Sequence, residues 1–157
     1  MKHAKKTVAA AMAGAILLAV PVTQKWEGVW LVAKPDTLAY GLPTVCYGET
    51  EGVRVGDRYT IAQCRDMLAK KLPRYANEIA RCIKVPITEE ALGAFIVFSY
   101  NVGSGAFCKS TALRKLNAGD TRGACESLRQ WVNAGGKFRQ GLLNRRNDEI
   151  DLCLSGE

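Results

Sequence analysis

The chain has 157 residues, with 22 Lys and Arg against 15 Asp and Glu, so its formal net charge is +7. At 48% hydrophobic and 24% charged residues, it is too apolar for a disordered chain, and it lacks both the Gly-X-Y period of collagen and the repeated apolar runs of a multi-span membrane protein. The length suits one globular domain, and the charge favours an anionic partner such as nucleic acid, a phospholipid surface or a cell-wall polymer.

The N-terminus combines a basic stretch with a weakly apolar run. Lys2, Lys5 and Lys6 precede residues 7–24, which carry no charge in 18 positions and include six Ala. At about 1.5 Å per residue such a helix just spans a hydrocarbon core of about 30 Å, and the lysines would keep its N-terminus in the cytoplasm. Its small-residue triplets precede the most apolar part, so we expect an uncleaved signal anchor over residues 1–24. A cleaved signal peptide is the alternative.

Residues 25–157 are predicted to form a single α+β domain. Residues 23–34 have the apolar spacing of a short helix. Residues 35–59 contain two Pro and four Gly, with β-prone pieces at 44–47 and 53–55 between them, which predicts a small hairpin lobe.

The rest of the chain has helical periodicity. Thr60 is the predicted N-cap of a long helix over residues 61–82, in which Pro73 should cause a kink or a break. Thr88, followed by two Glu, begins an apolar helix that we expect at the centre of the domain. Three further helices are expected between glycine stops, over residues 110–117, 121–133 (capped by Asp120) and 142–154.

The six cysteines predict disulfides rather than a metal site. None is at C-x-x-C spacing, and the single histidine, His3, lies in the N-terminal tail, so no metal or cofactor is expected. An even number of widely spaced cysteines is typical of an oxidising compartment. A bond between the hairpin lobe and the start of the long helix, Cys46 to Cys64, is plausible, and the pairing of the other four stays open. The candidates are Cys46, Cys64, Cys82, Cys108, Cys125 and Cys153.

Two carboxylates, Glu27 and Asp36, are candidates for acid/base chemistry. Cleavage of a glycosidic bond needs one carboxyl group that protonates the leaving oxygen and a second that stays ionised. Glu27 lies between Trp26 and Trp30, and apolar neighbours favour the protonated form of a carboxyl group. Asp36, in a polar turn, is expected to remain charged.

Every charged residue between Glu126 and Asp148 is basic. These residues indicate either a solvated helix face or a surface attracted to an anionic wall and membrane. Binding to nucleic acid is not expected, because the sequence has neither a recognised motif nor interleaved aromatic residues. The residues are Arg129, Lys137, Arg139, Arg145 and Arg146.

The order of these motifs resembles the phage-type lysozymes, glycoside hydrolase family 24. The likeness covers residues 25–154, and the weak anchor is similar to that of the signal-arrest-release endolysins of lambdoid-type phages. It rests on Glu27-Gly28 with Asp36, Leu42-Pro43-Thr44-Val45-Cys46-Tyr47-Gly48-Glu49-Thr50, Tyr100-Asn101-Val102-Gly103, Trp131-Val132-x-Ala134-Gly135-Gly136-Lys137 and Asn144-Arg145-Arg146.

The resemblance implies a lysozyme-like fold, with a small β-hairpin lobe on a mainly helical lobe. It also implies a monomeric, cofactor-free muramidase that cleaves the β-1,4 bond between N-acetylmuramic acid and N-acetylglucosamine in peptidoglycan, with inversion. Glu27 corresponds to the general acid, Asp36 to the second carboxylate and Thr44 to the hydroxyl that holds the attacking water. Seven residues separate Asp36 from Thr44, where the family usually has five, so Thr37 competes for the threonine role. Asn101 and Arg145 are expected to bind substrate.

We expect the chain to be held at the host inner membrane, facing the periplasm, and then to become soluble in the periplasm and cause lysis. Two rival functions remain at this point. A lytic transglycosylase would cut the same polymer with a single catalytic Glu and leave an anhydro product. A non-catalytic, disulfide-stapled wall-binding protein would keep its function after Glu27→Gln.

Overall fold

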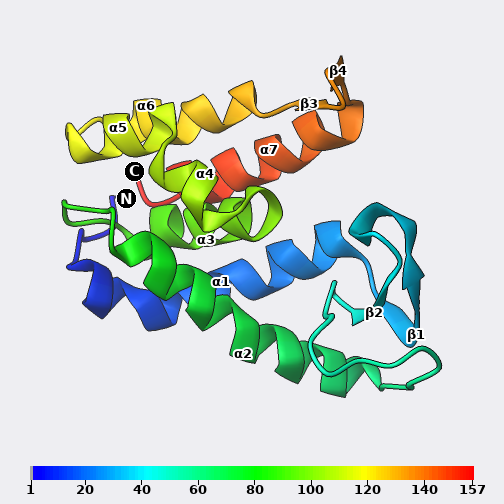
Figure 1. Cartoon of the computed structure of the whole chain (residues 1–157). Helices are drawn as coiled ribbons and strands as arrows, with labels where there is room; N and C mark the ends of the chain where they lie inside the picture. The colour runs from blue at the N-terminus through cyan, green and yellow to red at the C-terminus, as the bar shows by residue number, and fades with distance from the viewer. Residues whose placement is uncertain (1) are drawn as a thin grey trace.

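The computed structural model describes residues 2–157, and its helices surround a central helix, α3 (Glu89–Val102). The long helices α1 (Val8–Glu27) and α2 (Ile61–Ala80) lie beside α3, and α7 (Gln140–Leu154) packs against it from the other side (Figure 1). A small β-lobe lies at the end of α1 and α2 that is remote from the two chain termini. This is the α+β architecture, a small hairpin lobe on a mainly helical lobe, that was expected.

Helix α1 runs without a break from the candidate anchor into the candidate active site. The expected helix over residues 23–34 is therefore wrong in both its bounds. Residues 23–27 are the last turn of α1, and Gly28 ends the helix with φ +65°. After Gly28, β-branched and aromatic residues pair with a neighbouring strand instead of continuing the helix. The proposed division between residues 24 and 25 thus falls inside α1, and it stays a prediction for the anchored form.

The face of α1 that packs on α3 is made of small side chains. Its buried residues recur every four positions: Ala11, Ala15, Ala19 and Thr23. On the facing helix, a Cβ at Gly93 would come within 3.0 Å of the Ala15 carbonyl oxygen, so the two backbones approach closely. The other side of α1, which includes Leu17, is largely exposed.

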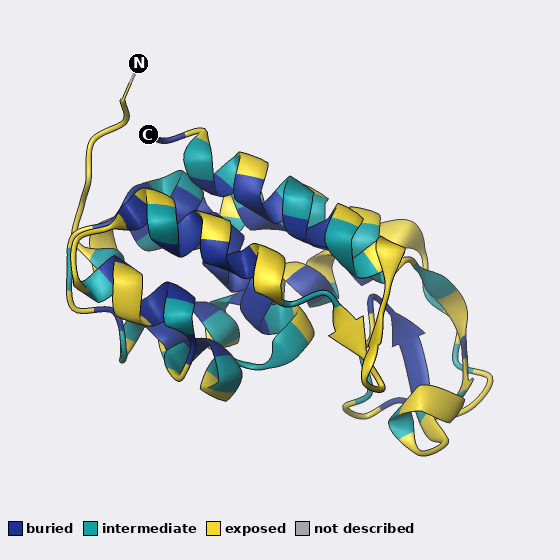
Figure 2. Ribbon diagram, turned by 90° about the horizontal axis from the view of Figure 1, so that it is seen from above, coloured by how far each residue is buried: buried dark blue, intermediate teal, exposed yellow. Residues whose placement is uncertain are grey.

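The β-lobe is a hairpin of β1 (Trp30–Asp36) and β2 (Leu42–Cys46), paired antiparallel with Lys34 opposite Thr44. A short 3₁₀ turn, η1 (Thr37–Ala39), joins the strands. A small hairpin lobe is thus confirmed, with β2 near the expected position, but its other strand is β1, which was expected to be largely helical, and residues 53–55 form no strand. Figure 2 shows that much of this lobe is exposed, whereas the helices turn their buried residues inward.

Local capping determines where α2 and α3 begin, as predicted. The Thr60 hydroxyl accepts from the Gln63 N–H at 3.1 Å, and the Gln63 side chain accepts from the Thr60 N–H at 2.8 Å, which makes a capping box. Thr88 caps α3 in the same way through the N–H of Ala91. Of the kink or break predicted at Pro73, the break is wrong, because α2 continues to Ala80. Its buried stripe of Cys64, Leu68, Leu72, Ala76 and Ile79 extends on both sides of the proline and holds the helix against the core.

The C-terminal half departs from prediction mainly after residue 127. The helices α4 (Ser104–Cys108), α5 (Thr111–Asn117) and α6 (Thr121–Ser127) are short, and Ser110 and Asp120 cap the last two. The expected helix over 121–133 instead ends at Ser127. It gives way to a 3₁₀ turn, η2 (Leu128–Gln130), and a small hairpin of β3 (Asn133–Ala134) and β4 (Lys137–Phe138), because Gly135 and Gly136 adopt positive φ between those strands.

Three disulfides link segments that are distant in sequence: Cys46–Cys64, Cys82–Cys108 and Cys125–Cys153. The first confirms the expected bond between the hairpin lobe and α2. The other two join the end of α2 to α4, and α6 to α7.

Within residues 2–157, one helix, α1, is long and apolar enough to cross a bilayer, with a mean hydropathy of 1.5 over 18 residues.

Candidate active site

The last turn of α1 is attached to α7 by three consecutive residues. Lys25 Nζ lies 2.6 Å from Asp148 Oδ2, and the Trp26 indole N–H donates to the same oxygen at 2.9 Å. Glu27 then accepts a hydrogen bond of 2.7 Å from Arg145 Nη2. The Glu27 carboxylate is thus positioned by the way the end of α1 docks on α7.

Of the two predicted apolar neighbours of Glu27, Trp30 lines a pocket with it, but Trp26 bonds to α7. Trp26 directs its indole N–H to Asp148, while the side chain bonded to Glu27 is a cation, Arg145. The pair is mostly enclosed: the Arg145 side chain is 7% exposed and that of Glu27 is 22% exposed. Arg145 therefore holds the candidate acid, Glu27, in place. Substrate binding was the only role predicted for Arg145.

Behind Glu27 lies a buried network of charges on α7. Arg145 Nε donates to Glu149 at 3.3 Å, and Arg146 Nε lies 2.8 Å from the other oxygen of Glu149. Arg146 also donates to Asn101 Oδ1 at 2.7 Å and lies over the Phe98 ring. Burial raises the pKa of Glu149 to about 7, an effect that the two guanidinium groups oppose. Burial likewise lowers the pKa of Arg146.

Glu27, Asp36 and Thr44 line a single open pocket of about 270 Å³ between the end of α1 and the β-lobe. The structure therefore brings together the three residues that the sequence predicted as catalytic. Trp30 and Leu38 supply apolar walls to the same pocket. This combination of apolar surface with a few polar groups is typical of small-molecule and saccharide sites.

Asp36 and Thr44 are both oriented by hydrogen bonds within the hairpin. Asp36 Oδ1 accepts from the Leu38 N–H at 2.9 Å, so one carboxylate oxygen secures the turn. The buried Thr44 hydroxyl donates to the Leu42 carbonyl at 3.1 Å, which leaves its oxygen lone pairs free to accept. Thr37, the competing candidate, is exposed and is not among the residues that line the pocket.

Tyr100, at the end of α3, links the core to the β-lobe. Its hydroxyl donates to the Tyr47 carbonyl, one residue beyond β2. Burial, followed by the nearby charge of Glu27, raises the pKa of Tyr100 above its ordinary value. The phenol is therefore a neutral donor that holds the hairpin against α3.

Several residues have positions that the sequence did not indicate. Asn101 is bonded to Arg146 and does not line the pocket, and Arg145 and Arg146 are buried instead of lying on a solvated basic face. Glu149 was missed, although its spacing of four and three residues from these two arginines is that of helical ion pairs. The other basic residues of this segment are exposed: Arg129, Lys137 and Arg139. Residues 2–157 contain no cluster of three His, Cys, Asp or Glu side chains suited to a metal ion.

A small hairpin lobe on a helical lobe, with a glutamate at a helix end and an aspartate on the hairpin at one open pocket, defines a lysozyme-like glycoside hydrolase. Comparison with known proteins agrees, because residues 24–149 match the phage lysozyme family, and the chain belongs to it. Membership of this family makes the chain a cell-wall-hydrolysing enzyme, an endolysin, as the resemblance predicted.

The similarity extends over the N-terminal helix. The SAR-endolysin of Enterobacteria phage P21 is 41% identical over 161 aligned positions, which cover 98% of this chain and 96% of that protein. The SAR-endolysin of Bacteriophage PS119 is 48% identical over 125 positions, 79% of this chain and 75% of that protein. A crystal structure of a mutant P22 lysozyme, 28% identical, superposes with a TM-score of 0.78 over 98% of this chain and 99% of its own.

Proposed function

We propose that this enzyme hydrolyses the β-1,4 bond between N-acetylmuramic acid and N-acetylglucosamine, with Glu27 as general acid and Asp36 as the carboxylate that activates water. The observation that carries the proposal is the convergence of Glu27, Asp36 and Thr44 on one pocket, from a helix end and from both strands of a hairpin. Hydrolysis needs a proton donor at the leaving oxygen and a base at the attacking water, and two carboxyl groups can meet these needs.

The roles follow from the chemistry of each group. Glu27 would deliver its proton to the glycosidic oxygen, and the Arg145 guanidinium would then stabilise the carboxylate that remains. An attacking water can donate one hydrogen to Asp36 and the other to the Thr44 hydroxyl oxygen, because that hydroxyl already donates to Leu42. The proposal therefore favours Thr44 over Thr37. It also implies inversion of the anomeric carbon, since the water attacks from the face opposite the leaving group.

The proposal includes a membrane-anchored, inactive precursor. A helix inserted in a bilayer cannot at the same time pack on α3, and the contacts of residues 25–27 with α7 belong to the docked position of α1. In the anchored form Glu27, only three residues beyond Gln24, would lie at the membrane surface without Arg145. The weak hydrophobicity of an Ala-rich α1 makes its exit from the lipid accessible once the membrane potential collapses. The released enzyme would then act from the periplasm.

The decisive experiment is digestion of purified peptidoglycan by the oxidised full-length chain, with product masses and anomeric configuration followed by mass spectrometry and NMR. Glu27→Gln is the test variant, and Glu126→Gln, the same change at an exposed carboxylate on α6, is the matched control. The proposal expects reducing products one water heavier than anhydro sugars, α-configured at first, and their loss in Glu27→Gln alone. Anhydro products would instead identify a transglycosylase, and full activity of Glu27→Gln would remove Glu27 from the mechanism.

A further inference from the structure

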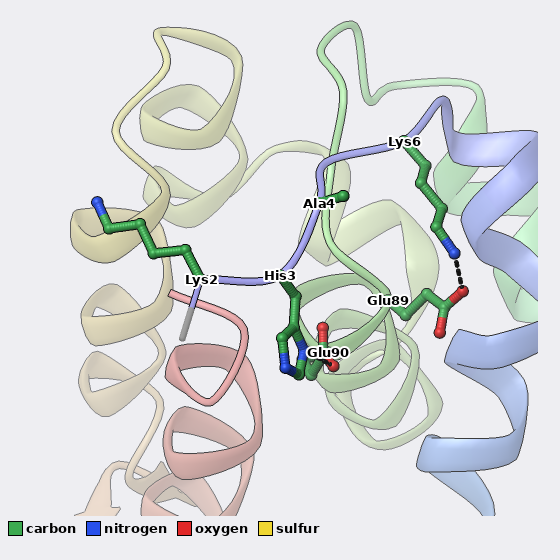
Figure 3. Close-up of a pocket in the computed structure, with 6 residues that line it drawn as sticks. All are labelled: Lys2, His3, Ala4, Lys6, Glu89 and Glu90. Carbon is green, nitrogen blue, oxygen red and sulfur yellow. Dashed lines mark hydrogen bonds and ion pairs between the residues drawn. The ribbon is translucent and has the colours of Figure 1, made fainter.

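The segment that precedes α1 is part of the folded enzyme. Residues 2–7, here called the N-terminal strap, lie along the start of α3 and the C-terminus, around an open pocket of about 350 Å³ (Figure 3). Lys6 and Ile87 exchange backbone hydrogen bonds of 2.9 and 2.8 Å, as two antiparallel strands do. Nearer the terminus, the His3 N–H donates to the Gly156 carbonyl at 3.0 Å.

The strap also pairs its basic side chains with the acidic first turn of α3. Lys6 Nζ lies 2.5 Å from Glu89 Oε1, and the His3 ring contacts the Glu90 carboxylate. Lys5 donates to the Thr121 hydroxyl at 3.1 Å, so it is held against α6. The Glu90 side chain is only 13% exposed, and its second oxygen is buried without a partner. Without the strap this partly buried carboxylate would lose its hydrogen-bonding contact with the His3 ring.

Glu89 contacts α1 as well as the strap. A Cβ at Gly14 would overlap the Glu89 carboxyl group, so the missing side chain makes room for Glu89 to cross α1 and reach Lys6. Glycine in a helix interior costs about 1 kcal/mol relative to alanine. Gly14 is therefore explained by the passage of this carboxylate, which ties the strap, α1 and α3 together.

The geometry points to a second function for the basic N-terminus. We propose that Glu89, Glu90 and the Ile87 backbone form an acidic docking surface whose occupant is the chain's own strap, and that this surface is filled only after the strap has crossed the membrane. This inference rests on the proposed release of α1. In the anchored form Lys2, Lys5 and Lys6 lie beyond a hydrocarbon core of about 30 Å from Glu89, on the cytoplasmic side. In the docked form the strap and Glu89 are in contact.

Docking of the strap adds polar contacts to α1, whose fully buried side chains are small. The side chains that α1 buries completely are three alanines and a threonine, and larger apolar side chains such as Met12, Ile16 and Val20 are only partly buried against the core. The Lys6–Glu89 ion pair, the contact of the His3 ring with Glu90 and the two backbone hydrogen bonds to Ile87 therefore add to the affinity of α1 for α3 at its N-terminal end. Complete translocation of the N-terminus, and not only exit of the apolar segment, would then be required for a stable active fold.

The test is a charge-swap cycle in the purified, oxidised full-length chain, using Lys6→Glu, Glu89→Lys and the double variant. Amide hydrogen exchange over residues 8–20 reports how firmly α1 is docked. Each single reversal is expected to speed this exchange about fivefold, and the double variant to return it to within about twofold of the parent. Glu126→Lys is the matched control, because it makes the same charge change in an exposed pair with Arg122 and should leave α1 unaffected.

Two outcomes would overturn the inference. If Lys6→Glu had no effect while Glu89→Lys speeded exchange, Glu89 would act only as a favourable acid at the helix N-terminus. If the double variant exchanged as fast as the singles, Lys6 and Glu89 would not be coupled. Peptidoglycan digestion by the parent chain tests the proposed function separately. If the parent chain digests peptidoglycan but Lys6 and Glu89 are not coupled, only docking of the strap is rejected. If the two residues are coupled but no digestion occurs, the proposed hydrolase activity is rejected.

In cells, Glu89→Lys isolates the strap surface from membrane topology. This substitution leaves the N-terminal lysines unchanged, so insertion and membrane fractionation should also be unchanged. After depolarisation, however, lysis should be several times slower than with Glu126→Lys. Equal lysis rates for the two variants would show that docking of the strap does not limit activation.

Discussion

Helix α1 has alanines on two faces that differ in burial, and leucine substitutions on each face should have separable effects. Ala11, Ala15 and Ala19 are buried against α3, whereas Ala9, Ala10 and Ala13 are exposed. Replacing either set of three by Leu raises the hydropathy of the segment equally. On the translocon scale each leucine favours insertion by about 0.5 kcal/mol, so three shift the membrane equilibrium about tenfold. Both triple variants should therefore be retained in the membrane fraction to the same extent.

The docked enzyme should distinguish the two faces. Ala15 has no exposed surface, and its backbone lies within van der Waals contact of α3 at Gly93, so three extra carbon atoms have no room. Overpacking of this kind costs about 1–3 kcal/mol. For a chain of this size, about 2 kcal/mol lowers Tm by about 4–8 °C. Ala15→Leu should show this loss in thermal unfolding of the purified protein, and Ala13→Leu should not.

The assay pairs membrane fractionation of the triple variants with differential scanning calorimetry of the single variants. Equal Tm values for Ala15→Leu and Ala13→Leu would refute the docked position of α1. Unequal retention of the two triple variants would instead refute the argument that composition alone controls anchoring.

Three further predictions concern the domain itself. Because burial raises the folded-state pKa of Tyr100, the unfolded chain ionises first, so stability is complete below the ordinary tyrosine pKa of about 10 and falls as pH rises above it. Tyr100→Phe should show a smaller decrease in Tm between pH 8 and 11, and an unchanged slope would contradict this. Removing the Cys125–Cys153 bond, which spans 28 residues, as a double Ser variant should cost about 3–4 kcal/mol in urea unfolding, whereas a cost below about 1 kcal/mol would indicate a compensating relaxation. Arg145→Met removes the cation bonded to Glu27 and leaves Glu149 paired with Arg146 alone, so we expect a loss of about 1–3 kcal/mol of stability together with lower kcat. Unchanged stability would show that Arg146 alone compensates the buried Glu149.

Much of the helical structure could be predicted because its signals are local. A capping hydroxyl at Thr60, Thr88 or Ser110 bonds a backbone N–H three residues later, so the start of each helix depends on a few neighbouring residues. The failures came where distant packing overrode the local pattern. Pro73 is tolerated because a continuous buried stripe holds α2 in place.

The candidate site was predictable only in part. Glu27 and Asp36 were candidates from their local sequence, and Thr44 came from the family resemblance; all three line one pocket, although their catalytic roles stay proposals. Arg145, the cation bonded to Glu27, was expected to bind substrate, and Glu149 was not predicted to belong to the site. Bonds such as the one from Arg145 to Glu27 join residues 118 positions apart, and no local pattern encodes them.

The sequence alone determined the class of this protein: a basic, cysteine-rich muramidase-like domain behind a weak, positively flanked apolar segment. The tertiary structure decided what the segment does once it is folded. The alanines and the glycine that make α1 a poor membrane helix are the residues that let it approach α3 and let Glu89 pass, and one of the lysines predicted to orient it in a bilayer, Lys6, pairs with Glu89 in the folded enzyme. Hydropathy and charge are properties of the segment itself, whereas close packing and ion pairing need a partner surface, which exists only in the folded chain.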